Sequence, residues 1–450
     1  MASPFDRLPV ELVAEITESL CPYCSLESWT RNYIPGSKYD RTAALLRLTR
    51  TCKLLNAVAT PHLYHHPLTS RWWLLARTLV TRPDLGLHVR SLLDNGKVRE
   101  RAFAGDEALE SFPVEVLSHF ADSALVRATE EERIAIVDTR VPWQVQSSWC
   151  DSSETLDMLV SLCPALREID ARVRIFNTPN VLIWSAPGSL LELKRLTLRH
   201  VSLGPSLSLN MLAQAATAAP NLASVILYDV KQGAGSPQTL PPMPNLVYLY
   251  LGNIAVCAQT VRNLLAACPN LQSFSYLSAQ PGAHETVTRS EMARSLVRAA
   301  PNLTTLVLAF HPVGGADPTD TTMPSLAGLS KLENLMLNLD CVLPAGMSSA
   351  APVLSLDPEL LVRMLPASIH TLSLPWTGLN LKVLSPLLLR LAFAPPSRFP
   401  SLKLVYVSEL AKPLKAVAED VAKVKAAFGE QGVEIVIRNF VGKSSRGQGH

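Results

Sequence analysis

One short phrase recurs along most of this chain and restricts its fold more than any other feature of the sequence. In each copy a leucine or isoleucine is followed by two further apolar residues, three and five positions later. The copies begin at Leu166, Leu193, Leu222, Leu246, Leu271, Leu303, Leu332, Ile369 and Leu402. Successive copies start 24 to 37 residues apart, and a fixed period of this length predicts a repeat architecture.

The pattern of the phrase predicts a half-buried strand preceded by a helix. The apolar residues at the end of the phrase alternate with polar ones, as they do in a strand with one buried face. In four copies Pro-Asn precedes the leucine, and helical patterns run before these prolines over residues 209–219, 260–268 and 290–300. Proline cannot continue the helical hydrogen bonds, and it disfavours helical backbone at the residue before it. We therefore expect each helix to end at its proline.

The phrase resembles the LxxLxL core of leucine-rich repeats. The resemblance implies an α/β fold over residues 154–440, a curved solenoid with parallel strands on the concave side and helices on the convex side. A helix over residues 413–428 and a strand over 433–437 would cap its end, before a disordered tail at 441–450. The asparagine (or cysteine) usual nine positions into the repeat is replaced, so we expect water or local turns to satisfy the backbone there. The replacing residues are Val230, Ile254, His311, Asp340 and Thr377.

The start of the chain has a different, purely helical pattern. Leu12, Ile16 and Leu20 recur every four residues with Val13 beside them, which predicts a helix with one apolar face. A second helix is predicted over residues 42–55, and a third piece is expected to break at Pro61. Three short helices bury little surface, so we expect apolar side chains to remain available for a partner.

These residues resemble an F-box in the form common among filamentous-fungal F-box proteins. Residues 8–12 (LPVEL) match its opening, and residues 45–53 and 61–64 match its second half. The resemblance implies docking onto the Skp adaptor of an SCF-type cullin-RING ubiquitin ligase. The adaptor contacts that it implies are Leu8, Pro9, Leu12, Ile16, Leu48 and Cys52. The alternative is that these six residues form the core of the helical unit.

An insert, residues 21–40, separates the two halves and begins with Cys21-Pro22-Tyr23-Cys24. This string resembles the glutaredoxin motif, but the reactive thiolate there begins a helix after a strand, whereas here the motif follows a predicted helix. A zinc site would need two more ligands, and the nearest candidates are distant in sequence: Cys52, His62, His65 and His66. We favour a simple loop, and we expect no metal and no cofactor.

A binding face is expected on the repeats, where the third, fifth and seventh residues of each phrase would line one side of the sheet. These positions hold Arg195 and Arg199 in early repeats and Tyr228, Tyr248 and Tyr250 in middle ones. Tyrosine and arginine are favoured as binding anchors, so these five are the candidate target-binding residues. The alternative is that tyrosine is present because it suits a strand.

The composition of the chain and its lack of catalytic motifs argue against several classes of function. The net charge is +3 and no basic block stands out, which argues against nucleic acid. No apolar run reaches the roughly 18 residues of a membrane span, and the eight scattered cysteines are interpreted as reduced. We expect a cytoplasmic or nuclear protein. No HExxH, GxSxG or phosphate-binding glycine loop occurs, so no catalytic residue is proposed and the chain is not expected to be an enzyme.

The sequence thus predicts a substrate-recognition subunit of an SCF ligase, with an F-box at residues 1–66, a connector at 67–153 and repeats at 154–440. The alternative is a repeat scaffold or inhibitor without a ligase role. A thiol oxidoreductase acting through Cys21 is a third, weaker hypothesis.

Overall fold

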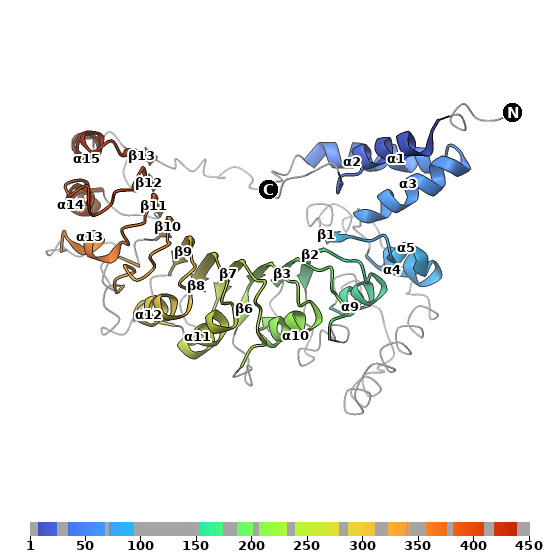
Figure 1. Cartoon of the computed structure of the whole chain (residues 1–450), viewed down its shortest axis with the longest axis horizontal. Coiled ribbons are helices and arrows are strands. Elements are labelled where there is room, and N and C mark those ends of the chain that lie inside the picture. The colour runs from blue at the N-terminus through green and yellow to red at the C-terminus, as the bar shows by residue number, and fades with distance from the viewer. Residues whose placement is uncertain are drawn as a thin grey trace, which may run out of the picture. The chain divides into compact units, whose positions relative to one another are not determined.

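The computed structural model (Figure 1) describes residues 8–24, 35–67, 72–93, 153–173, 187–200, 207–231, 239–278, 287–310, 323–338, 341–342, 357–375, 381–408 and 418–438. Of the predicted connector, residues 94–152 lie outside these residues, as do the predicted tail at 441–450 and several segments between the copies of the phrase. The chain divides into two compact units, Met1–Ser224 and Val225–His450.

The fold is mixed α/β, and its main feature is an open eleven-stranded parallel sheet. The strand order is β1-β2-β3-β5-β7-β8-β9-β10-β11-β12-β13, so the strands of this sheet are neighbours in the order in which they follow one another in the chain; β4 and β6 pair in a separate two-stranded sheet. This order is the one that a stack of strand-and-helix repeats produces.

The first unit combines five amino-terminal helices with the first strands. Its helices are α1 (Val10–Leu20), α2 (Pro35–Thr49), α3 (Lys53–His65), α4 (Trp72–Thr81), α5 (Pro83–Gly86), α9 (Ser153–Leu162) and α10 (Asn210–Ala218). Its strands are β1 (Ser91–Leu93), β2 (Glu168–Val173), β3 (Arg195–His200) and the short β4 (Leu207–Ser208).

The second unit continues the alternation, and in Figure 1 its helices follow one side of its strands. Its strands are β5 (Ser224–Tyr228), β6 (Val230–Lys231), β7 (Tyr248–Ile254), β8 (Ser273–Ser278), β9 (Thr305–Ala309), β10 (Asn334–Leu337), β11 (Thr371–Pro375), β12 (Leu404–Ser408) and β13 (Glu434–Arg438). Its helices are α11 (Ala258–Ala267), α12 (Arg289–Ala299), α13 (Leu360–Met364), α14 (Leu381–Ala392) and α15 (Ala418–Glu430).

Every predicted copy of the phrase forms a strand, and in several of these strands burial alternates along the chain. In β5, β9 and β11, alternate residues are buried and half-buried. The buried positions align across strands: Leu249 of β7 faces Phe274 of β8, which faces Leu306 of β9. The repeated apolar positions therefore stack into one continuous core.

The prolines end the helices as predicted. α10, α11 and α12 stop two residues before Pro220, Pro269 and Pro301. The intervening residues have left helical backbone geometry, with φ and ψ of −124° and 76° at Ala219 and −125° and 59° at Ala300. A following proline disfavours helical backbone at the residue before it, and this accounts for the departure.

Three predicted boundaries in the amino-terminal region were wrong. The second helix begins at Pro35, inside the segment predicted as a loop, and ends at Thr49. The third runs from Lys53 through Pro61 to His65. A proline this close to a helix end removes a single hydrogen bond, and the helix continues for one more turn. The apolar residues within 87–92 (LHVRSL) also predict a first strand, and the structure places β1 later and makes it shorter, at Ser91–Leu93.

Asparagine side chains at the start of the phrase join successive repeats, a role that was not predicted from the sequence. The asparagine of the Pro-Asn-Leu phrase donates to a carbonyl of the preceding repeat: Asn221 to Leu191 at 2.9 Å, Asn270 to Pro244 at 2.9 Å and Asn302 to Pro269 at 3.2 Å. In these repeats the asparagines thus form a side-chain ladder at the start of the phrase.

A further turn is held by Asn338, just after β10. Its amide donates to the Phe310 carbonyl at 2.6 Å, and its oxygen accepts from the Phe310 N–H at 3.1 Å. Both backbone groups of Phe310, whose side chain is buried, are thus paired by one side chain.

Replacing Asn338 with alanine is expected to lower the free energy of unfolding by about 1–3 kcal/mol, because two backbone groups lose their partner. The matched control is Asn334→Ala on the same strand, whose side chain is exposed and whose loss should cost less than about 0.5 kcal/mol. Urea denaturation of both variants compares the two, and equal midpoints would contradict this role of Asn338.

Candidate functional site

Helix α1 is apolar on two sides, and among the residues that the structure describes only one of these sides is buried. Val13 and Thr17 point into the unit and are buried. Leu12 and Ile16, one position earlier in each turn, are 47% and 48% exposed. A helix that buries one face normally presents polar residues on the other, so the outer apolar face of α1 is a candidate contact surface.

The structure separates the six predicted adaptor residues into two groups. Leu8, Pro9, Leu12 and Ile16 are exposed, on or directly before α1. Leu48 and Cys52 are half-buried, and Leu48 packs against the core cluster formed by Cys21, Leu45 and Ala59. Two exposed apolar residues were missing from the predicted contacts: Val10 on α1, 48% exposed, and Leu46 on α2, 40% exposed.

The same helical unit gathers four side chains that share metal-ligand chemistry. The sulfur or nitrogen atoms of Cys21, Cys24, His62 and His65 all lie within 4.8 Å of one another. Cys24 Sγ is 3.2 Å from His65 Nδ1 and 3.7 Å from His62 Nδ1, and Cys21 Sγ is 3.7 Å from His65 Nδ1. The expectation of no metal site here treated the histidines as distant, and in space they are not.

Local structure explains this arrangement. α1 ends at Leu20, so Cys21 to Cys24 form the turn directly after it. His62 and His65 are three residues apart on α3, which places them on one face of that helix. The helices bring the two pairs together, although about forty residues separate them along the chain. We call these four residues the Cys/His cluster.

The pKa values of the two thiols are shifted in opposite directions. The pKa of Cys21 is lowered, first by its hydrogen bond with the Cys24 thiol and then, against the effect of burial, by contacts with His62 and His65. The pKa of Cys24 is raised, first by the hydrogen bond with Cys21 and then by burial. The Cys24 N–H also donates to Cys21 Sγ at 3.4 Å, which favours a thiolate at Cys21.

The local structure around Cys21 differs from the glutaredoxin arrangement. Cys21 follows the carboxyl end of α1, where the helix dipole is negative and disfavours a thiolate. In the glutaredoxin arrangement the cysteine would begin a helix after a strand. What lowers the pKa of Cys21 is the Cys/His cluster.

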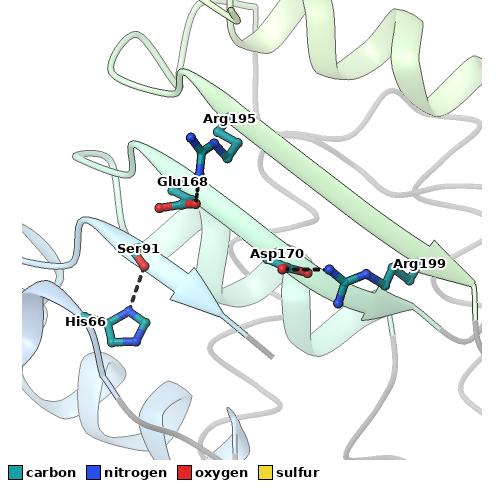
Figure 2. Close-up of polar contacts among 6 residues, drawn as sticks. All are labelled: His66, Ser91, Glu168, Asp170, Arg195 and Arg199. Atoms are coloured by element: carbon teal, nitrogen blue, oxygen red, sulfur yellow. Dashed lines mark hydrogen bonds and ion pairs between the residues drawn. The ribbon is translucent and has the colours of Figure 1, made fainter. Parts of the chain in front are cut away.

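Figure 2 shows that the two predicted binding arginines are already paired. Arg195 Nη1 lies 2.8 Å from Glu168 Oε1, and Arg199 Nη2 lies 3.1 Å from Asp170 Oδ2. β2 supplies the carboxylates and β3 the guanidinium groups, so these pairs join neighbouring repeats. The pairing of Arg195 with Glu168 could have been predicted from the sequence, because the two residues occupy the same position of successive phrases. A target would have to compete with these carboxylates for the arginines.

A buried contact in the same view ties the helical unit to the first strand. His66 Nδ1 lies 2.8 Å from Ser91 Oγ, and both residues are buried. His66 directly follows α3 and Ser91 begins β1. The sequence made His66 a possible zinc ligand. In the structure it contacts Ser91 instead and lies outside the Cys/His cluster, which ends at the preceding residue, His65.

Two of the three predicted tyrosines contact each other in the second unit. The ring centroids of Tyr228 and Tyr250 are 4.9 Å apart, and both side chains are half-buried. Tyr248 lies two residues earlier on β7 and is also half-buried. Burial raises the pKa of Tyr250, and the neighbouring Tyr228 adds to this.

A glycine makes room for this pair. A Cβ atom at Gly252 would lie 2.7 Å from the Tyr250 ring and 2.8 Å from the Tyr228 ring. Beside them, Asp229 and Asn253 have positive φ angles of 58° and 52°, and the Asn253 amide donates to the Asp229 carboxylate. The end of β5 and the middle of β7 thus form one tight aromatic and polar surface.

The fold and these sites define a class of protein: a parallel α/β repeat protein whose chain begins with the packed helices α1 to α3. The chain matches no model of a known protein family, and no curated protein matches it. Among the helices of the described residues, none has the length and apolarity needed to cross a membrane.

Proposed function

We propose that this chain is a substrate-recognition subunit of an SCF-type ubiquitin ligase. In this role α1 to α3 are an F-box that binds the Skp adaptor, and the leucine-rich-repeat solenoid binds a target protein. The observation that carries the proposal is the second apolar face of α1, with Leu12 and Ile16 about half exposed.

The energetics of that face fit a docking surface. Burying a leucine or isoleucine completely contributes roughly 1.5–3 kcal/mol, so covering the remaining half contributes roughly 1 kcal/mol per side chain. Leu8, Val10, Leu12, Ile16 and the neighbouring Leu46 are all 38–48% exposed. A partner that covers them gains several kcal/mol, enough to anchor a specific interface.

The target would lie on the exposed side of the strands. Alternate strand residues point away from the core, and stacked repeats turn them into an extended surface. The Tyr228–Tyr250 pair is the strongest anchor on it, because rigid aromatic side chains lose little entropy on binding. Arg195 and Arg199 would contribute less, since each is paired with a carboxylate.

The mechanism in this proposal is proximity. A subunit that holds the adaptor at one end and a target at the other raises the effective concentration of the target near the ligase. The chain then needs two binding surfaces and no reacting group.

Binding of the purified chain to a Skp adaptor, measured by co-purification and calorimetry, tests the proposal. A double variant, Leu12→Asp with Ile16→Asp, is expected to weaken adaptor binding at least 100-fold, because two carboxylates would be buried without partners. The matched control is Leu87→Asp, at a leucine 56% exposed outside α1, which should leave binding unchanged.

Two results would contradict the docking role: a wild-type chain that does not bind the adaptor, or a double variant that binds as well as the control. Either result would favour the scaffold or inhibitor, in which the amino-terminal helices only cover the end of the sheet.

A further inference from the structure

We propose that Cys21, Cys24, His62 and His65 bind one structural zinc ion. This inference does not depend on the ligase role, because it rests only on the Cys/His cluster. Four potential ligand atoms, two sulfurs and two nitrogens, lie within 4.8 Å of one another.

The spacing of these atoms matches a tetrahedral site. Zinc–sulfur and zinc–nitrogen bonds of about 2.3 and 2.0–2.1 Å place a sulfur and a nitrogen roughly 3.5 Å apart in a tetrahedron. Three of the four sulfur–nitrogen separations in the cluster are 3.2, 3.7 and 3.7 Å. Little movement of the side chains is needed to receive the ion.

The chemistry of the ligands selects zinc. Thiolates with imidazoles in a tetrahedral set suit Zn²⁺, whereas Mg²⁺ and Ca²⁺ require oxygen ligands. With four protein ligands the coordination shell is closed, as in structural sites, and no position remains for substrate or water. The site would therefore stabilise the fold and take no part in catalysis.

The surroundings already orient the ligands. Both histidines present Nδ1 to the sulfurs, and the edge of the Tyr23 ring lies against His65 with centroids 6.1 Å apart. The Cys24 N–H donates to Cys21 Sγ, a contact that stabilises a thiolate ligand. Hydrogen bonds and packing of this kind fix ligand geometry at metal sites.

The helical unit also has a small core, in which Val13, Thr17 and Leu55 are buried besides the core cluster. Its core cluster contains three fully buried residues, Cys21, Leu45 and Ala59. Small domains with such cores are commonly stabilised by a metal or by disulfides. An ion held by the Cys/His cluster would join the end of α1 to the end of α3 across 41 residues, from Cys21 to His62.

The test uses the full chain, purified under reducing conditions without chelator. Elemental analysis is expected to find one zinc per chain. After chelation, Co²⁺ added as a probe should give the visible absorption of a tetrahedral site with thiolate ligands. Cys24→Ser and His65→Asn are expected to lose zinc, whereas the matched controls Cys52→Ser and His88→Asn should keep it, because Cys52 and His88 lie outside the cluster.

A second measurement keeps the test valid if a variant fails to fold. Chelated wild-type protein should unfold at a lower temperature and recover when Zn²⁺ is restored, but not when Mg²⁺ is added. At a free Zn²⁺ concentration 100 times Kd, the unfolded fraction should fall about 100-fold. The proposal is overturned if the wild type neither contains zinc nor binds Co²⁺, or if all four variants retain the metal. A disulfide between Cys21 and Cys24 in the reduced preparation would also overturn it.

Discussion

Replacing Phe274 with alanine is expected to lower the free energy of unfolding of the second unit by about 3–5 kcal/mol. Phe274 is fully buried in β8. Its neighbours in register are Leu249 of β7 and Leu306 of β9, so the cavity would open between three repeats. Because repeats are stabilised mainly by their neighbours, the loss affects both adjacent interfaces.

The measurement is guanidinium denaturation, followed by far-ultraviolet circular dichroism. The matched control is Gln272→Ala, two residues earlier in the same phrase and exposed, which should change stability by less than about 0.5 kcal/mol. A loss below about 1 kcal/mol for Phe274→Ala would show that the stacked positions of the phrase do not form a continuous core.

Removal of zinc from the Cys/His cluster is expected to unfold the amino-terminal helices and to leave the sheet intact. Structural zinc contributes an apparent ~10–16 kcal/mol in zinc-finger peptides at neutral pH. The three fully buried residues of the core cluster contribute far less, since a large apolar side chain adds roughly 1.5–3 kcal/mol. The ion would thus be the largest single term in the stability of α1 to α3.

Hydrogen exchange with and without chelator distinguishes local from global effects. Amides of α1 and α3 should lose protection on chelation, whereas those of β7, β8 and β9 should keep it. Cys52→Ser, with the cluster intact, should respond to chelator as the wild type does. Unchanged protection of α1 and α3 would contradict a stabilising role for the metal, and equal loss in the strands would contradict its local character.

The two proposals meet at α1. Its outer face would bind the adaptor, and its carboxyl end leads directly into Cys21. If both proposals hold, chelation should weaken adaptor binding as strongly as the Leu12 and Ile16 double variant does. If the chain binds zinc but not the adaptor, the result supports the metal site and contradicts the ligase role.

The sequence by itself determined the repeat. Strand positions, their alternating burial and the helix ends before Pro220, Pro269 and Pro301 follow from local rules, because residues two to four positions apart decide them. Such rules failed at Pro61, where packing of α3 continued the helix beyond a residue that disfavours it.

Only the tertiary structure decided the sites. Periodicity identified α1 as apolar but could not choose which side it buries, since Leu12 and Val13 are equally apolar and packing selected Val13. The arginines were correctly placed in strands; register then set Arg195 beside Glu168, and Arg199 pairs diagonally with Asp170, whose partner in register is Thr197. The Cys/His cluster depends on how α1 packs against α3, because about forty residues lie between its two halves. No local pattern can specify a contact over that separation.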